Sequence, residues 1–484
     1  MYQSRFSRSL FFRSAAALAG IALVPLLARG QNKPALRALL VAGGPSLEQN
    51  EYAIESNARY LESLTKDAAW QRVHFADGKR TSRTIGAVEG AAQSPEALVL
   101  DWILDEDTAP TSRTVRRAST LKRIDGPSTE AAILKSVANF TRDAENARGL
   151  LYFTGHGSTG ENEDTQNTTY AAWGGSELSA RELAGVLQKW PEKAPLVLVM
   201  VQCHAGGFAN LMFEGGDPSN PVWNRDFAGF FAATGDRQSS GCTAEMDERN
   251  YQDFTTHFFA ALAGRTRDGQ RAANADYDRN GAISMSEAFA YANINDRSID
   301  VPVATSDTYL RRIYASSNDS EWTKTPYSQV LQNATPWQRA MLTGLSRELK
   351  LSGEGRVRAA WQVFQRVEKE GPEGEIYNSH PDVVKRYARL ERAFFGRFPQ
   401  LQKSKPTART RQAALRWLRT QKQDVGYLNR VIREGGEVRH ALLLRFVRAT
   451  RTVTLQTRLK ANGTPEQKAI LARLRTSEGR NPLR

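Results

Sequence analysis

Two short apolar runs in the middle of the chain each end abruptly at small or reactive residues. The first, Gly149–Thr154, is followed by Gly-His-Gly-Ser, and the second, Leu196–Val201, is followed by Gln-Cys-His-Ala. Runs rich in β-branched and aromatic residues that stop in this way are typical of buried parallel strands, which deliver a side chain to the edge of a sheet. The first strand would deliver His156 and the second Cys203.

The segment between these runs predicts a helix. Ser179-Ala-Arg-Glu182 has the form of a capping box, and the helix is expected over Leu183–Trp190. A strand, helix, strand order forms a right-handed crossover that places the two strands side by side. His156 and Cys203 should therefore meet at one edge of the sheet.

The same pattern of apolar runs extends to both sides of this segment. Together these elements predict an α/β fold with a mostly parallel central sheet. The expected strands are Ala35–Ala42, Gln71–Phe75 and Phe227–Thr234. One expected helix has Ile54, Ala58, Leu61 and Leu64 on one face, and two more are expected over Ser128–Arg142 and Glu287–Asn295.

Two further regions differ from this pattern. Residues 79–127 hold paired basic residues among Ser, Thr and Pro, which favours a solvated insertion. From about residue 317 the apolar positions recur at helical spacing only, and Gly and Pro separate the stripes, so a helical module of bundled hairpins is expected over 317–484. The stripes are Val357, Ala360, Trp361, Phe364 and Val367; Val383, Tyr387, Leu390 and Phe394; Ala414, Trp417 and Leu418; and Leu428, Val431 and Ile432.

Charge separates the helical module from the rest. The 484-residue chain has a net charge of +14, but residues 321–484 hold 33 Lys and Arg against 14 Asp and Glu, a difference of +19. Residues 1–320 then hold 33 Lys and Arg against 38 Asp and Glu, a net charge of −5. Such asymmetry fits a module that contacts an anionic polymer or envelope, although Arg-rich helix faces are often merely solvated.

Residues 1–30 have the composition of an export signal. Arg5, Arg8 and Arg13 precede the apolar run Ala15–Ala28, and the small residues near Gly30 suit cleavage before Gln31. A retained membrane anchor is the alternative. We therefore expect a periplasmic or extracellular protein whose folded part begins at residue 31, with residues 31–316 as its α/β domain.

The chain has two cysteines, Cys203 and Cys242, which in an exported protein could form a structural disulfide. The position of Cys203 at a strand end opposite His156 favours a free nucleophile instead, because an imidazole keeps a neighbouring thiolate populated and later donates a proton. Cys242 is then expected to be an ordinary or partly buried thiol. The side chain of His204 should point to the other side of the strand end and have a structural role.

His156-Gly157 and Gln202-Cys203, 47 positions apart, resemble the caspase, legumain, gingipain and metacaspase group of cysteine peptidases. The resemblance implies a caspase-like three-layer α/β/α sandwich and an endopeptidase with a Cys203–His156 dyad and no essential third residue. The backbone N–H groups of Gly157 and Cys203 would bind the oxyanion. The resemblance also places Gln202 and Asp236 at the substrate, where the acid at position 236 would favour Arg or Lys before the cut bond; a surface turn with Asp236 paired to Arg237 is the alternative.

Residues 276–287 fit the twelve-residue calcium-loop pattern at every required position. Calcium prefers several oxygen ligands from one tight loop, with a bidentate Glu at the last place. The alternative is an ordinary helix start, since Ser284 and Glu287 also form a capping box. The expected role of the ion is structural, and the chemistry needs no cofactor. The ligands would be Asp276, Asp278, Asn280, Ala282 through its carbonyl, Ser284 and Glu287.

The prediction from these observations is an exported cysteine endopeptidase acting on protein or peptide substrates. The alternative is a catalytically silent protein of the same fold, whose basic helical module, residues 317–484, binds anionic surfaces or nucleic acid. No sequence motif for specific nucleic-acid recognition is present.

Overall fold

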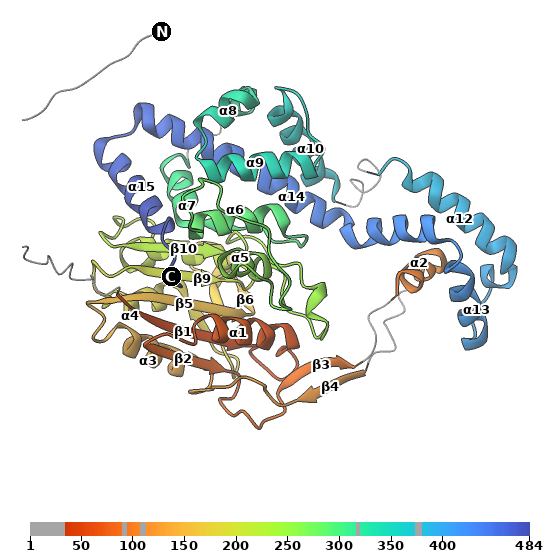
Figure 1. Ribbon diagram of the computed structural model, residues 1–484, viewed down its shortest axis with the longest axis horizontal. Coiled ribbons are helices and arrows are strands. Elements are labelled where there is room, and N and C mark those ends of the chain that lie inside the picture. Colours follow the sequence, from red (N-terminus) through yellow and green to blue (C-terminus); the bar gives the residue numbers. More distant parts are fainter. Residues whose placement is uncertain (1–33, 90–93, 107–112, 316–319, 373–379) are drawn as a thin grey trace, which may run out of the picture. The chain divides into compact units, whose positions relative to one another are not determined.

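The computed structural model describes residues 34–89, 94–106, 113–315, 320–372 and 380–484, so the export signal predicted for residues 1–30 lies outside the described residues. A six-stranded sheet has the order β11-β10-β9-β5-β1-β2 (Figure 1). All neighbouring strands pair in parallel except β10 and β11, which are antiparallel. The strands are β1 (Ala35–Gly43), β2 (Trp70–Phe75), β5 (Ala147–Gly155), β9 (Leu196–Met200), β10 (Phe227–Phe231) and β11 (Val303–Ala304).

Both faces of this sheet are buried, as the continuous apolar runs predict. Successive side chains of a strand point to opposite faces, so Leu150 and Tyr152 of β5 lie in one apolar cluster while Leu151 and Phe153 lie in another. The protein therefore has an α/β fold with a mostly parallel central sheet and helices on both faces. One face is covered by α1 (Tyr52–Leu64), α5 (Phe254–Ala263) and α6 (Met285–Asn295), and the other by α3 (Glu130–Thr141), α4 (Ala180–Leu187) and α7 (Thr305–Ile313).

The local signals at the helix starts are confirmed. Ser179 and Glu182 form the expected capping box at α4, and Ser284 and Glu287 form a second one at α6. Because β5, α4 and β9 follow one another and β5 pairs in parallel with β9, the crossover predicted between the two apolar runs is present.

The solvated interpretation of residues 79–127 is wrong for much of that segment. Strands β3 (Ile85–Glu89) and β4 (Arg113–Arg117) form an antiparallel pair, and α2 (Pro95–Leu104) lies between them in sequence. Its side chains Val99, Leu100 and Ile103 are buried against residues more than 270 positions later in the chain. Within this segment, the apolar run Ala97–Leu104 therefore belongs to a short helix that packs against C-terminal helices.

The region after residue 320 is helical without strands in its described parts, as expected. Helix α14 is interrupted at Gly435, where φ is +50°, a backbone conformation that favours glycine. None of the helices in the described ranges is long and apolar enough to cross a membrane. The helices are α8 (Tyr327–Asn333), α9 (Pro336–Glu348), α10 (Arg356–Glu370), α12 (Val383–Arg397), α13 (Ala408–Leu418), α14 (Lys422–Asn462) and α15 (Pro465–Glu478).

Helix α14 is joined to the α/β region by a buried arginine. Both Arg445 and Asp296 have fully buried side chains, with 3.1 Å between Nη2 and the carboxylate. The guanidinium also donates to the carbonyls of Asn293 in the last turn of α6 and of Asp296, Ser298 and Asp300 in the segment that follows it. Burying such a charge is tolerable only because every face of the guanidinium finds an acceptor.

Replacing Arg445 by alanine should lower the free energy of unfolding by about 3–5 kcal/mol, because the carboxylate of Asp296 would stay buried without its partner. Chemical denaturation followed by circular dichroism measures the change. Arg249→Ala is the control, since Arg249 pairs with Asp247 at the surface and is 75% exposed. Equal stability of the two variants would show that the buried pair does not hold α14 in place.

Candidate active site

His156 directly follows β5, and its ring contacts a carboxylate that the sequence analysis did not single out. Nε2 lies 3.1 Å from Oε2 of Glu51, the residue that precedes α1. The two side chains are 23% and 20% exposed, so the pair is accessible but shielded. The ring makes no other hydrogen bond among the described residues, which leaves Nδ1 without a partner there, whereas the backbone carbonyl of His156 accepts from the N–H of Ala171 at 3.0 Å.

Cys203 lies three residues beyond β9, and its sulfur is held against the segment that follows β10. Sγ is 3.4 Å from the backbone nitrogen of Ser239 and 3.6 Å from its carbonyl oxygen. The hydroxyl of Ser239 donates to the carbonyl of Val201 at 2.8 Å, which fixes the segment beside the end of β9. The sulfur can therefore donate as a thiol or accept the Ser239 N–H as a thiolate.

Both cysteines are free, so the disulfide alternative is excluded in this structure. Cys242 is partly buried, as the sequence suggests, and its thiol donates to the carbonyl of Gly155 at 3.3 Å. Burial raises the pKa of the Cys242 thiol well above its usual value, and the neighbouring Glu51 and Cys203 raise it further. A thiol in such surroundings is a weak nucleophile.

The structure brings Cys242, not Cys203, into the closest group with the imidazole. The ligand atoms of Glu51, His156 and Cys242 all lie within 4.8 Å of one another. The described hydrogen bonds of His156 do not include one to Cys203. The Cys203–His156 contact predicted from the two strand ends thus stays a prediction.

Gly157 explains how closely the two strand ends approach. A Cβ atom built on Gly157 would lie 2.5 Å from the carbonyl oxygen of Cys203, 2.6 Å from Cγ of Gln202 and 2.7 Å from the carbonyl oxygen of Thr169. Only glycine fits at this position without movement of the backbone. The strand β6 (Gly157–Ser158) then pairs with β7 (Thr169–Ala171), which in turn pairs with β8 (Glu177–Ser179).

Two residues predicted to touch substrate do not lie as expected. Gln202 is fully buried, and neither its amide oxygen nor its nitrogen has a hydrogen-bond partner in the described chain. A side chain directed into the protein cannot contact a substrate, so that assignment is wrong for this structure. Asp236 is exposed in the turn after β10, and Thr234 donates to its carboxylate. The turn interpretation thus fits Asp236, with Thr234 as its hydrogen-bond partner where Arg237 was expected.

His204 has the structural role expected of it. Its φ is +60°, in the left-handed region, and its Nδ1 lies 2.9 Å from the carbonyl oxygen of Gly235. The ring therefore fastens the turn after β9 to the turn after β10. The sequence analysis placed the side chain away from the reacting groups, and this contact agrees with that.

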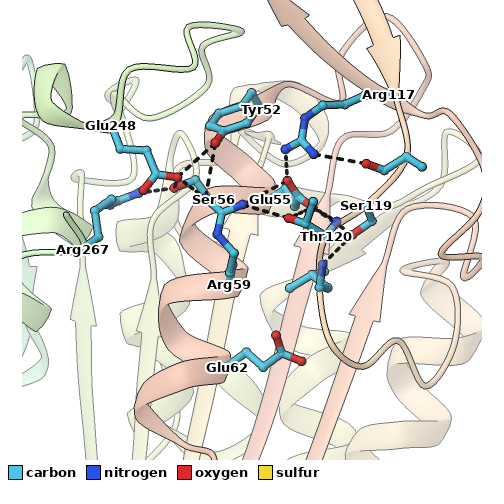
Figure 2. Close-up of polar contacts among 12 residues, drawn as sticks. Tyr52, Glu55, Ser56, Arg59, Glu62, Arg117, Ser119, Thr120, Glu248 and Arg267 are labelled. Atoms are coloured by element: carbon cyan, nitrogen blue, oxygen red, sulfur yellow. Dashed lines mark hydrogen bonds and ion pairs between the residues drawn. The ribbon is translucent and has the colours of Figure 1, made fainter. Parts of the chain in front are cut away.

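A buried polar network fixes the start of α1, which carries Glu51 (Figure 2). Glu55 is fully buried and accepts hydrogen bonds from three residues of the 117–120 segment, while Glu248 accepts from residues of α1. A carboxylate with several donors can stay buried and charged. The members are Tyr52, Glu55, Ser56, Arg59, Arg117, Ser119, Thr120, Glu248 and Arg267.

The calcium-type loop has converging carboxylates. Oxygen atoms of Asp276, Asp278 and Glu287 lie within 4.8 Å of one another, and Gly281 has a φ of +84°. Glu287 is buried and accepts from the backbone nitrogens of Tyr277, Asp278 and Ser284. Glu287 therefore belongs both to the capping box and to the group of converging acids, so the two interpretations are compatible. The backbone nitrogen of Ala282 donates to the side-chain oxygen of Asn280.

Comparison with known proteins identifies no family for this chain. The chain matches no family model and no curated protein. A crystal structure of protein GSU0716 from Geobacter sulfurreducens aligns with 48% of this chain and 82% of its own length, at 12% sequence identity and a TM-score of 0.28. A likeness this low supports no argument about function.

Replacing Gly157 by alanine should disrupt the site, because the added methyl group would collide with backbone oxygens on two sides. We expect a cost of about 1–3 kcal/mol in unfolding free energy and loss of Cys203 reactivity toward iodoacetamide. Gly185→Ala is the matched control, since Gly185 lies in α4 with no atom within 4 Å of an added Cβ. A Gly157→Ala protein with wild-type stability and labelling would contradict the close approach.

Proposed function

We propose that this protein is a cysteine endopeptidase of the caspase type, in which Cys203 attacks the peptide carbonyl and His156 transfers the proton. The observation that carries the proposal is the convergence of three elements at one edge of a parallel sheet: the ends of β5 and β9 and the Ser239 segment after β10. Ligand and substrate sites of open α/β sheets lie at the carboxyl edge of the strands.

The assignment of Cys203 as nucleophile rests on its surroundings. Its sulfur is partly exposed and faces the N–H of Ser239, a donor that can stabilise negative charge on sulfur. Cys242 groups with Glu51 and His156, but burial raises its pKa and its thiol donates a hydrogen bond to the carbonyl of Gly155. Both thiols are partly exposed, so the choice of Cys203 rests on the Ser239 N–H that faces it and on the raised pKa of Cys242.

Glu51 acts in this proposal as a positioning residue. If its carboxylate accepts the proton on Nε2, the imidazole of His156 carries its lone pair on Nδ1, the nitrogen without a partner. Nδ1 then takes the Cys203 proton as the C–S bond forms, and returns it to the amine as the C–N bond breaks. A small movement of the ring or of the Cys203 turn would complete the contact when substrate binds. The backbone N–H groups of Gly157 and Cys203 are the proposed oxyanion donors.

The proposal also covers the type of fold, the C-terminal helices, the location of the protein and its cleavage preference. We propose that the layers on both faces of the sheet form a caspase-like sandwich, and that the basic helices after residue 317 form a C-terminal module that contacts an anionic envelope or polymer. Export to the periplasm or exterior is also proposed. A preference for Arg or Lys before the cut bond would rest on exposed Asp236 alone.

Labelling with iodoacetamide in metal-free buffer tests the dyad. We expect rapid modification at Cys203, retained in Cys242→Ser and largely lost in His156→Ala. Peptide hydrolysis by His156→Ala should fall by about 100-fold or more, the usual share of a general acid–base group. Glu51→Gln should lower kcat with little change in KM, since it acts through the ring.

Two results would count against the dyad. Preferential labelling of Cys242 would transfer the role to that thiol. Slow labelling of Cys203 that is equal in wild type and His156→Ala would instead support the catalytically silent alternative, with anion binding as the function.

We also propose that residues 276–287 bind calcium and brace the start of α6. The support is the set of converging oxygens on a tight loop, a donor set that suits a hard cation. The proposed ligands are Asp276, Asp278, Asn280 and Glu287 with the Ala282 carbonyl and Ser284. The ion would take no part in the chemistry.

Calcium at about 100 times its dissociation constant should stabilise the protein by about 2.7 kcal/mol and raise Tm accordingly. The shift should vanish in Asp276→Asn, and it should persist in Asp268→Asn, which removes an exposed acid of a neighbouring turn. Differential scanning fluorimetry with calcium or with a chelator measures this. An identical Tm in both buffers would mean that the loop is only a helix start.

A further inference from the structure

Glu51, His156 and Cys242 form a group of three different ligating side chains that the proposed reaction uses only in part. Their ligand atoms lie within 4.8 Å of one another, and Nε2 of His156 is 3.1 Å from Oε2 of Glu51. The three residues come from the start of α1, the end of β5 and the segment after β10. These three segments all adjoin the central sheet, so the fold brings the three side chains together.

The spacing matches a tetrahedral zinc ion. Bond lengths of about 2.0–2.1 Å to nitrogen or oxygen and about 2.3 Å to sulfur place two ligand atoms roughly 3.3–3.6 Å apart. The 3.1 Å between the imidazole and the carboxylate is close to this value. The ligand atoms lie within 4.8 Å of one another, so each distance to the Cys242 sulfur would need to shorten by roughly 1.2 Å or less, and the fourth position would stay open for water.

The chemistry of the donors also favours zinc. One thiolate, one imidazole and one carboxylate form a mixed soft and borderline set, which zinc accepts and which calcium and magnesium do not. The two negative charges of the thiolate and the carboxylate balance Zn²⁺, so the filled site would be neutral in partly buried surroundings. On binding, the Cys242 thiol would release its proton to solvent and exchange its hydrogen bond to Gly155 for a bond to the metal.

A cavity adjoins one member of the group. It has a volume of about 200 Å³ and is lined by the segment Ser239–Thr243, which includes Cys242, and by Glu245, Asn250 and Asp253. The all-oxygen loop at residues 276–287 is a separate group, so the two metal preferences can be tested independently.

We propose that Glu51, His156 and Cys242 bind a zinc ion that switches off the Cys203 chemistry. Zinc on Nε2 fixes the imidazole proton on Nδ1, and the ring can then no longer accept the proton of Cys203. Zinc also withdraws Glu51 from the ring. The inhibitory part rests on the proposed function, whereas the binding part does not.

Titration of the metal-free, full-length protein tests the binding. We expect one Zn²⁺ taken from a chromophoric chelator, and one Co²⁺ that produces a thiolate-to-metal charge-transfer band. Cys242→Ser should abolish the band, and Glu51→Gln should weaken zinc binding by about 100-fold or more, because even outer contacts of metal ligands contribute 10–100-fold. Glu51→Gln keeps the shape of the side chain, so it remains informative if Cys242→Ser does not fold.

Two control variants separate this site from its neighbours. Cys203→Ser removes the proposed nucleophile and should keep full zinc affinity and the charge-transfer band. Asp276→Asn should also keep both. A band that is lost in Cys203→Ser but kept in Cys242→Ser would overturn the assignment, as would zinc affinity that Glu51→Gln leaves unchanged.

Inhibition is then measured separately. Zinc should slow the alkylation of Cys203 in the wild type, and a chelator should restore it. In Cys242→Ser the same zinc concentration should have little effect. If zinc binds as described but Cys203 proves unreactive in its absence, the zinc site stands and the peptidase proposal fails; if Cys203 is reactive and zinc does not bind, the reverse holds.

Discussion

The parallel pairing of β5 with β9 is the constraint on which the site depends. The register joins Gly149 to Leu196 and Phe153 to Met200, so the two strands end at the same edge. The side chains that follow them must then share a small space, and Gly157 is needed because an added Cβ atom would lie 2.5 Å from the carbonyl oxygen of Cys203. A change of register by one residue would turn every side chain of β9 to the other face. Backbone pairing therefore decides which side chains meet at this edge of the sheet.

Polar contacts then place the groups that strand pairing cannot. Glu51 stands before α1, whose position is fixed by the hydrogen bonds of buried Glu55 to the 117–120 segment. The segment that carries Ser239 and Cys242 is held by Asp300, which accepts from the backbone nitrogens of Ser240 and Phe254. Asp300 in turn offers its carbonyl to Arg445 of α14. The C-terminal helices thus contact the loop behind the site, in addition to carrying the basic surface.

The sequence predicts those parts of the fold that depend on local patterns. Apolar runs locate β1, β2, β5, β9 and β10, and the two capping boxes locate the starts of α4 and α6. Helix α2 is missed because its burial depends on partners far along the chain, so its apolar run has no local explanation. His156 and Cys203 are found because they follow strands.

Glu51 and Cys242 are missed for the same physical reason as α2. Neither residue ends an apolar run, and each reaches His156 only through the folding of a separate segment. A signal for Glu51 does exist, since it stands directly after the β1 turn at the start of a helix, where an acid is favoured by the helix dipole. Gln202 shows the opposite error, because a residue next to a strand end can point into the protein as readily as out of it.

The two thiols of the site differ because their surroundings differ, although both adjoin the same sheet edge. Burial and the nearby carboxylate of Glu51 raise the pKa of Cys242, so this thiol stays protonated unless a cation replaces its proton. Cys203 faces a backbone N–H and is partly exposed, which would suit the nucleophile of the proposed reaction. Burial, with a smaller contribution from the Glu51 carboxylate, keeps Cys242 a thiol. The carboxylate that contacts the imidazole therefore also bears on the second sulfur, and a divalent cation bound there would change the surroundings of both groups.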